Sequence, residues 1–161
     1  MSQVTAETQT AIRNLLREVV IGPEAEYGQL LEHNASFLRT LEATSAKLAA
    51  TSAALGRPSL AQHTRHAAMS LRYRADWLEG RETQPDWSGV WMVPNLDDAT
   101  LTDSAWQALQ DDLRGAHEAF EKALEHKIWP GELEELLAVS THIAYHLAIV
   151  RQIKLNLLAE A

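Results

Sequence analysis

Two histidines, His142 and His146, stand four residues apart in the apolar, proline-free stretch 139–153. Because four residues make about one helical turn, both rings should project from the same face of a helix as Ile153. Imidazoles that point into an apolar core lose their water contacts and need a hydrogen bond, a salt partner or a metal ion instead. The pair therefore predicts either a metal site or two hydrogen-bonded core histidines. It is not the H-E-x-x-H zinc motif, because Ile143 occupies the glutamate position.

A second helix should carry two more inward-facing histidines. Apolar residues recur with helical spacing over 60–79, where Ser59 precedes them as an N-cap and Gly80 follows as a C-terminal stop. On the helical wheel the charged side chains gather on one side, whereas His63 and His66 lie on or beside the opposite arc. Three or four imidazoles on two helices are hard to attribute to chance core filling, so the pattern favours a metal ion.

The other three histidines are not expected to be ligands. His33 falls on an apolar segment, where a hydrogen-bonded or half-exposed imidazole is the expected role. His117 and His126 stand among charged neighbours, and both are predicted to lie on the surface.

The chain as a whole predicts one all-α domain over residues 1–161. Strands are not expected, because β-branched residues are few and alternation is absent. Residues 42–55 fit either a tapering helix or a packed connection, and Asp103 or Ser104 should cap the third bundle helix. The helices expected from apolar spacing are 5–20, 23–41, 60–79, 103–124 and 132–158. The predicted fold is a helical bundle of four long helices with an additional N-terminal helix.

Residues 81–102 interrupt the helical pattern between the second and third bundle helices. A long irregular segment inside a small domain is often functional. Trp87, Trp91 and Met92 are too apolar for a solvated loop, so we expect a folded flap packed on the bundle. The flap either roofs the histidine site or closes the end of the bundle.

Composition excludes several functions. The formal net charge of −8, with scattered Lys and Arg, argues against a nucleic-acid partner. Because cysteine is absent, any metal site must use His, Asp or Glu. The N-terminus does not resemble a signal peptide, and no uncharged apolar run approaches the ~18 residues of a membrane span, so a cytoplasmic protein without a membrane partner is expected.

None of the seven histidines follows an acidic residue by three positions, as di-iron carboxylate bundles require.

The stretches Ser59-Leu-Ala-Gln-His-Thr-Arg-His-Ala-Ala and His142-Ile-Ala-Tyr-His-Leu-Ala-Ile-Val-Arg-Gln-Ile resemble the DinB/YfiT-like superfamily of metal-dependent bundle proteins. The second is similar to that family's H-x-x-Y-H-x-G-x-I-R-Q pattern and departs from it at Ala148, where glycine is common. The order of elements also agrees, including the tryptophan-bearing insertion.

The resemblance implies a DinB-like four-helix bundle with up-down-down-up connections, which usually forms a homodimer. By position it implies that one middle-helix histidine and the pair His142 and His146 hold a divalent metal. The family's spacing favours His66 as the middle-helix ligand, whereas the helical wheel places His63 nearer the centre of the inward arc. His63 would then support a ligand or act as a fourth one. Tyr145, Trp87 and Trp91 would flank a pocket.

Three neutral imidazoles on a divalent ion leave positions open for a thiol or water, whose pKa the ion would lower. Zn or Ni is expected, with Fe or Mn as alternatives. Two functions fit. One is a thiol-dependent S-transferase or related enzyme that acts on a small molecule with a low-molecular-weight thiol. The other is a non-catalytic binding or stress-related bundle whose metal or histidine cluster is structural. The sequence does not separate them.

Overall fold

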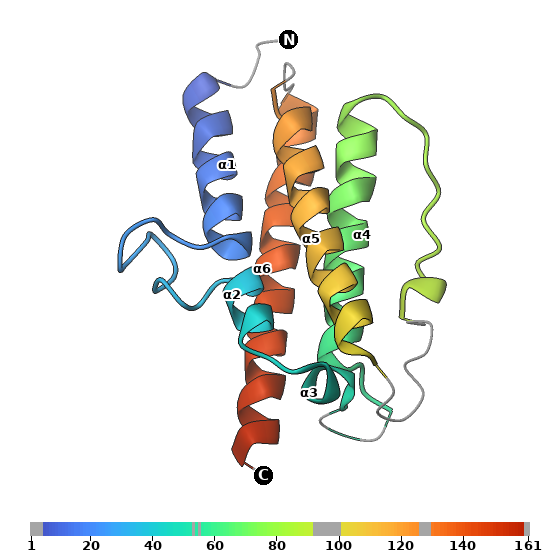
Figure 1. The fold of residues 1–161 in the computed structure, drawn as a ribbon. Helices are drawn as coiled ribbons and strands as arrows, with labels where there is room; N and C mark the ends of the chain where they lie inside the picture. Colours follow the sequence, from blue (N-terminus) through green and yellow to red (C-terminus); the bar gives the residue numbers. More distant parts are fainter. Residues whose placement is uncertain (1–4, 53, 55, 92–100, 126–129, 160–161) are drawn as a thin grey trace.

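The computed structural model describes residues 5–52, 54, 56–91, 101–125 and 130–159, and this part of the chain is helical, as predicted (Figure 1). It contains no strand apart from one isolated bridge between Tyr27 and Glu32. The helices are α1 (Ala6–Val20), α2 (Phe37–Glu42), α3 (Ala46–Ala50), α4 (Leu60–Leu78), the 3-10 helix η1 (Gly89–Trp91), α5 (Asp103–Ala123) and α6 (Pro130–Ala159).

Four long helices, α1, α4, α5 and α6, pack around one apolar core. Helix α4 packs mainly against α5 and also against α6, while α1 packs mainly against α6. In Figure 1, α1 and α6 run down the page and α4 and α5 run up it. Each long helix contributes side chains that are almost completely buried: Leu16, Leu71, Phe120 and Ile143. Helix α1 is therefore one of the four long helices and not an addition to them.

The start and end of α4 follow the prediction. Ser59 caps the helix, and its hydroxyl accepts a hydrogen bond from the Gln62 amide while the Gln62 side chain accepts one from the Ser59 amide. This reciprocal capping box satisfies two amides that would otherwise lack partners. At the other end, Gly80 adopts a φ of +73°, a backbone conformation that glycine reaches without a steric penalty. The two signals set where the helix that carries His63 and His66 begins and ends.

The predicted helix over 23–41 is wrong, except for the part that lies in α2. The carboxylate of Glu18, itself buried, accepts hydrogen bonds from the backbone amides of Gln29 at 2.9 Å, Leu30 at 2.6 Å and Leu31 at 2.5 Å. These three amides therefore donate to the Glu18 carboxylate and not to backbone carbonyls of a helix. A Cβ on Gly28 would collide with the Glu18 carboxylate, so the glycine permits this approach.

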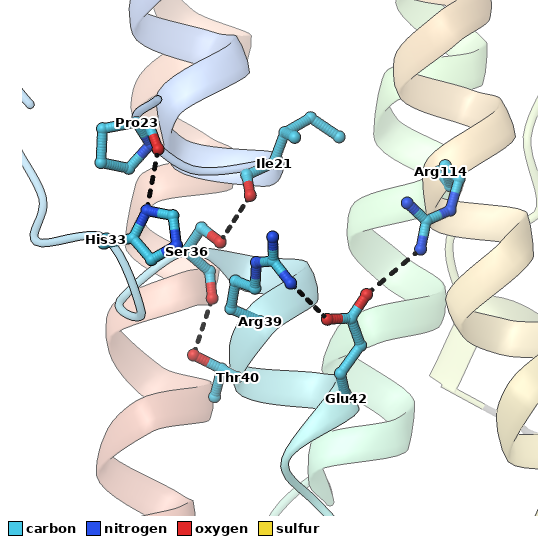
Figure 2. A network of polar contacts seen from close by, with 8 residues as sticks. All are labelled: Ile21, Pro23, His33, Ser36, Arg39, Thr40, Glu42 and Arg114. Carbon is cyan, nitrogen blue, oxygen red and sulfur yellow. Dashed lines mark hydrogen bonds and ion pairs between the residues drawn. The ribbon is translucent and has the colours of Figure 1, made fainter. Parts of the chain in front are cut away.

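Polar contacts then hold α2 against its neighbours (Figure 2). The Ser36 hydroxyl donates to the Ile21 carbonyl at 2.9 Å, and the Thr40 hydroxyl donates to the Ser36 carbonyl at 2.7 Å. The Glu42 carboxylate lies between two arginines, 3.4 Å from Arg39 and 3.3 Å from Arg114 of α5. These contacts tie α2 to the end of α1 and to α5.

The other boundaries differ little from expectation. The connection after α2 contains one short helix, α3, so it is mostly a packed connection. The cap of α5 is Thr102 and not Asp103 or Ser104, because the Thr102 hydroxyl accepts from the Ala105 amide at 3.2 Å. Helix α6 begins at Pro130, shortly before the predicted start.

Candidate metal centre

The structure brings together His66 of α4 with His142 and His146 of α6. One ring nitrogen from each lies within 4.8 Å of the others. His66 and His146 are buried, and His142 is half-buried. Helices α4 and α6 pack against each other. The two α6 histidines, one turn apart, therefore face the inward side of α4. Of the two middle-helix candidates, His66 is the one that joins this three-histidine cluster.

His63 contacts the same cluster from one turn earlier on α4. Its Nδ1 lies 2.9 Å from Nδ1 of His146, and both side chains are buried. A second pair, Nε2 of His66 and Nε2 of His142, is also 2.9 Å apart. A neutral imidazole has one donor and one acceptor nitrogen, so each pair can form one hydrogen bond if the tautomers match. His63 is therefore placed to fix the tautomer and orientation of His146.

Hydrogen bonding accounts for only some of the ring nitrogens. Nδ1 of His66 and Nε2 of His146 are buried and have no hydrogen-bond partner. A buried polar atom without a partner costs about 1–3 kcal/mol. Since Nδ1 of His146 is engaged by His63, its Nε2 is the atom left to bind a ligand. Zinc–nitrogen bonds are about 2.0–2.1 Å, so two nitrogens on one ion are at most about 4.2 Å apart. The three clustered nitrogens lie within 4.8 Å of one another, slightly more than this limit, so a small rotation of the rings would let the three histidines hold one divalent ion.

The electrostatics keep these imidazoles neutral, which is the form that binds a metal. Burial lowers the pKa of His146 to about 3, and the positive charge that His142 and His66 would carry contributes to this shift. Burial, followed by the nearby His142, lowers the pKa of His66 to about 4. Burial also lowers the pKa values of His63 and His142, the latter helped by the Arg74 guanidinium. At neutral pH each ring in the cluster therefore keeps one unprotonated nitrogen.

The described part of the flap before residue 92 covers this cluster. The Trp91 indole stacks on the His66 ring, with centroids 4.5 Å apart and planes 13° apart, and meets His63 edge-on at 5.5 Å. The Gln62 side-chain amide donates to the Trp91 carbonyl, which ties η1 to the first turn of α4. Trp91 therefore takes the first of the two roles expected for the flap, the roof over the histidines. Met92 lies outside the described residues.

Trp87 and Tyr145 flank the cluster on its exposed side. Trp87 is 44% exposed and lies 6.0 Å from the His66 ring and 5.4 Å from the Tyr73 ring. Tyr145 is 61% exposed, and its ring meets His146 edge-on at 5.3 Å. Solvent therefore comes closest to the histidines beside these two rings and the half-buried His142.

The prediction for His117 is wrong, because this side chain on α5 is only 2% exposed. Its Nε2 lies 3.7 Å from a Glu121 oxygen, which is too long for a hydrogen bond. Burial, then the positive charge of Arg17, lowers its pKa to about 4, and Glu118 only partly opposes this. A helical wheel of α5 could have predicted that His117 is buried, because Leu113 and Phe120 lie one turn before and after it on the same face. Both are buried.

Of the two remaining histidines, the structure describes His33, which lies outside the three-histidine cluster. His33 is exposed, and its Nδ1 is 3.2 Å from the Pro23 carbonyl, in agreement with the hydrogen-bonded role predicted for it (Figure 2). His126 lies outside the described residues.

Comparisons of this chain with protein-family models, with curated proteins and with solved structures gave no match.

Proposed function

We propose that this chain is a metal-dependent protein of the DinB-like superfamily, in which His66, His142 and His146 hold a divalent transition metal, with Zn or Ni first and Fe or Mn as alternatives. The observation that carries the proposal is the buried cluster of neutral imidazoles with an unpartnered Nε2 on His146. The up-down-down-up connection is part of the same proposal, and the opposite directions of α1 and α4, with α5 parallel to α4, support it.

An ion at this site would lower the pKa of a bound thiol or water toward neutrality. Two side chains of the protein would shape the surroundings of the bound ion. The His63 ring orients His146, and the Trp91 indole excludes water from the His66 side. The three-residue cluster contains no carboxylate that could serve as a base. A bound thiolate needs no separate base once formed, so we favour a thiol-dependent S-transferase that acts on a small molecule.

The second candidate is a structural site in a non-catalytic binding or stress-related bundle. The position of His63 supports it, because a fourth nitrogen ligand would close the site, as structural zinc sites are closed. The two candidates differ in solvent access, since only the first needs an open ligand position beside the flap.

The decisive experiment is the metal content of protein purified without an affinity tag, compared with His66→Ala and His142→Ala. We expect near-stoichiometric metal in the parent and loss of the metal in both variants. His33→Ala is the matched control, because it removes an exposed histidine outside the cluster and should keep the metal. A parent protein that binds neither Zn nor Ni when these are supplied would refute the metal proposal. A further rise in melting temperature on adding a thiol to the metal-loaded protein would favour the transferase.

We further propose that the protein is a homodimer. Helix α6 exposes an apolar stripe over about two turns, on which Leu137 is 49% and Tyr145 61% exposed. A second copy of the same helix would bury this stripe, as an isologous interface requires.

Helix α6 is also long and apolar enough, over Gly131–Ala159, to cross a membrane by length and composition alone. Core helices of soluble proteins pass the same test, and this helix carries two of the clustered histidines and packs against α1 and α4. We therefore infer that α6 is a helix of the bundle and not a membrane span. We propose a cytoplasmic protein that binds neither membranes nor nucleic acids.

A further inference from the structure

A second candidate site lies away from the histidines, in a groove of about 490 Å³ that opens to solvent between α2 and α6. Its charged lining consists of Arg39 and Glu42 from α2 with Arg151 and Lys154 from α6. None of the clustered histidines lines this groove. Its volume is within the range of about 300–1,000 Å³ that is usual for small-molecule sites.

The single carboxylate in the groove is already engaged. Glu42 contacts Arg39 at 3.4 Å and Arg114 at 3.3 Å, so it lies between two cations (Figure 2). Arg39 is therefore mostly offset by Glu42. The carboxylate has little capacity left to neutralise the two cations of α6.

Those two cations have no carboxylate partner in the described part of the chain. The Lys154 ammonium donates to the neutral Thr40 carbonyl at 3.2 Å, which leaves two of its three N–H groups free. Arg151, exposed three residues earlier, makes no hydrogen bond or ion pair with any residue that the structure describes. In a protein with a net charge of −8, two uncompensated cations in one groove mark a local positive field.

The rest of the lining is partly apolar. Leu155, which is 60% exposed, and Ala43 add apolar surface to the groove that the two cations line. A ligand that fits both parts has an anionic head and a compact apolar body. A phosphate monoester carries about −1.5 to −2 charges at pH 7, which matches two cations better than the single charge of a carboxylate. Arginine also binds phosphate oxygens through two parallel N–H groups.

We propose that the groove between α2 and α6 binds a small phosphate monoester, whose phosphate contacts Arg151 and Lys154 and whose apolar body lies against Leu155 and Ala43. This binding is independent of the metal proposed at the histidines. Occupancy of the groove would also bridge α2 to the C-terminal half of α6, since the two cations and Arg39 come from different helices.

The test is a titration of the ¹⁵N-labelled protein with phenyl phosphate, followed by amide chemical shifts. The parent should show saturable shifts at residues 39–43 and 151–155. Removing one charge-assisted contact should weaken binding about tenfold, so we expect that loss in Arg151→Gln and in Lys154→Gln. Arg57→Gln is the matched control and should bind as the parent does, because Arg57 is exposed and outside the groove. Circular dichroism spectra should be unchanged in all three variants.

Inorganic phosphate and benzoate separate the two parts of the ligand. Both should bind more weakly than phenyl phosphate, because one lacks the apolar body and the other carries a single charge. Three results would overturn the proposal: no saturable shift at the groove, equal weakening by Arg57→Gln, or tighter binding of benzoate than of phenyl phosphate. All of these are measured on metal-free protein, so they leave the histidine proposal to its own experiment.

Discussion

The contact between Glu18 and the loop after α1 gives the sharpest prediction for stability. Three consecutive amides, those of Gln29, Leu30 and Leu31, donate to this one buried carboxylate. Hydrogen bonds to a charged group contribute about 1.5–3 kcal/mol each. Glu18→Gln keeps the shape and one acceptor oxygen but loses the charge and presents an NH₂ group to amides that cannot accept. We therefore expect the free energy of unfolding to fall by about 2–3 kcal/mol, which for a domain of this size lowers the melting temperature by about 5–10 °C.

The pH dependence of the parent tests the same contact. Burial alone would raise the pKa of Glu18, but the hydrogen bonds from Leu30, Leu31 and Gln29 outweigh it and hold the pKa below its ordinary value. A carboxylate with a lowered folded-state pKa contributes stability that is present above its ordinary pKa of 4.5 and is lost as the pH falls through the folded value. The Glu18→Gln variant should lack this part of the acid sensitivity.

Urea unfolding and amide hydrogen exchange measure the effect. The exchange protection of the Gln29, Leu30 and Leu31 amides should be lost selectively in Glu18→Gln. Glu26→Gln is the matched control, since Glu26 is an exposed carboxylate in the same loop. Equal unfolding free energies for the two variants, with the three amides still protected, would show that the carboxylate does not hold the loop.

Three further predictions concern the histidines and the proposed dimer. His63→Ala removes the partner of His146 Nδ1 and should weaken metal affinity by about 10–100-fold in a chelator competition; unchanged affinity would refute the orienting role. Because burial lowers the pKa of His117 to about 4, its stability contribution is complete above about pH 6.5 and is lost as the pH falls toward 4, so His117→Gln should remove up to about 3 kcal/mol of acid sensitivity in urea unfolding. A variant curve parallel to that of the parent would contradict this. Tyr145→Glu adds a charge to the exposed α6 stripe and should give monomers in analytical ultracentrifugation, whereas a retained dimer would exclude this face.

The histidine cluster was predictable because helical periodicity alone decides which side chains share a face. His142 and His146 are one turn apart, and the capping signals Ser59 and Gly80 set where the α4 wheel begins and ends. Neither signal shows which residues of two helices meet. The nearness of His66, rather than His63, to both α6 histidines comes from how α4 and α6 cross.

The loop after α1 was not predictable from local pattern. Leu30, Leu31 and Phe37 have the spacing of a helical face, and nothing local marks Glu18 as a partner eleven to thirteen residues earlier. A carboxylate in an amphipathic helix normally faces water, so its burial against three amides is a tertiary feature that overrides helix propensity. The error for His117 has a different cause. Charged sequence neighbours point to other faces of a helix, so they say little about the burial of the residue between them.

The histidine cluster lowers the stability of the fold, and this cost in folding free energy is the strongest argument that the cluster has a role. An apolar core could fill the same space between α4 and α6 without desolvating four imidazoles. Instead the protein keeps four rings neutral, pairs them at 2.9 Å in two places and leaves Nε2 of His146 without a partner. Each such orphan costs about 1–3 kcal/mol, a noticeable part of the roughly 5–15 kcal/mol by which domains are stable. Departures from a well-satisfied core are expected where function requires them. A bound ion would give Nε2 of His146 a partner, and it would bind the neutral form of all three rings. It would also account for the indole that covers them.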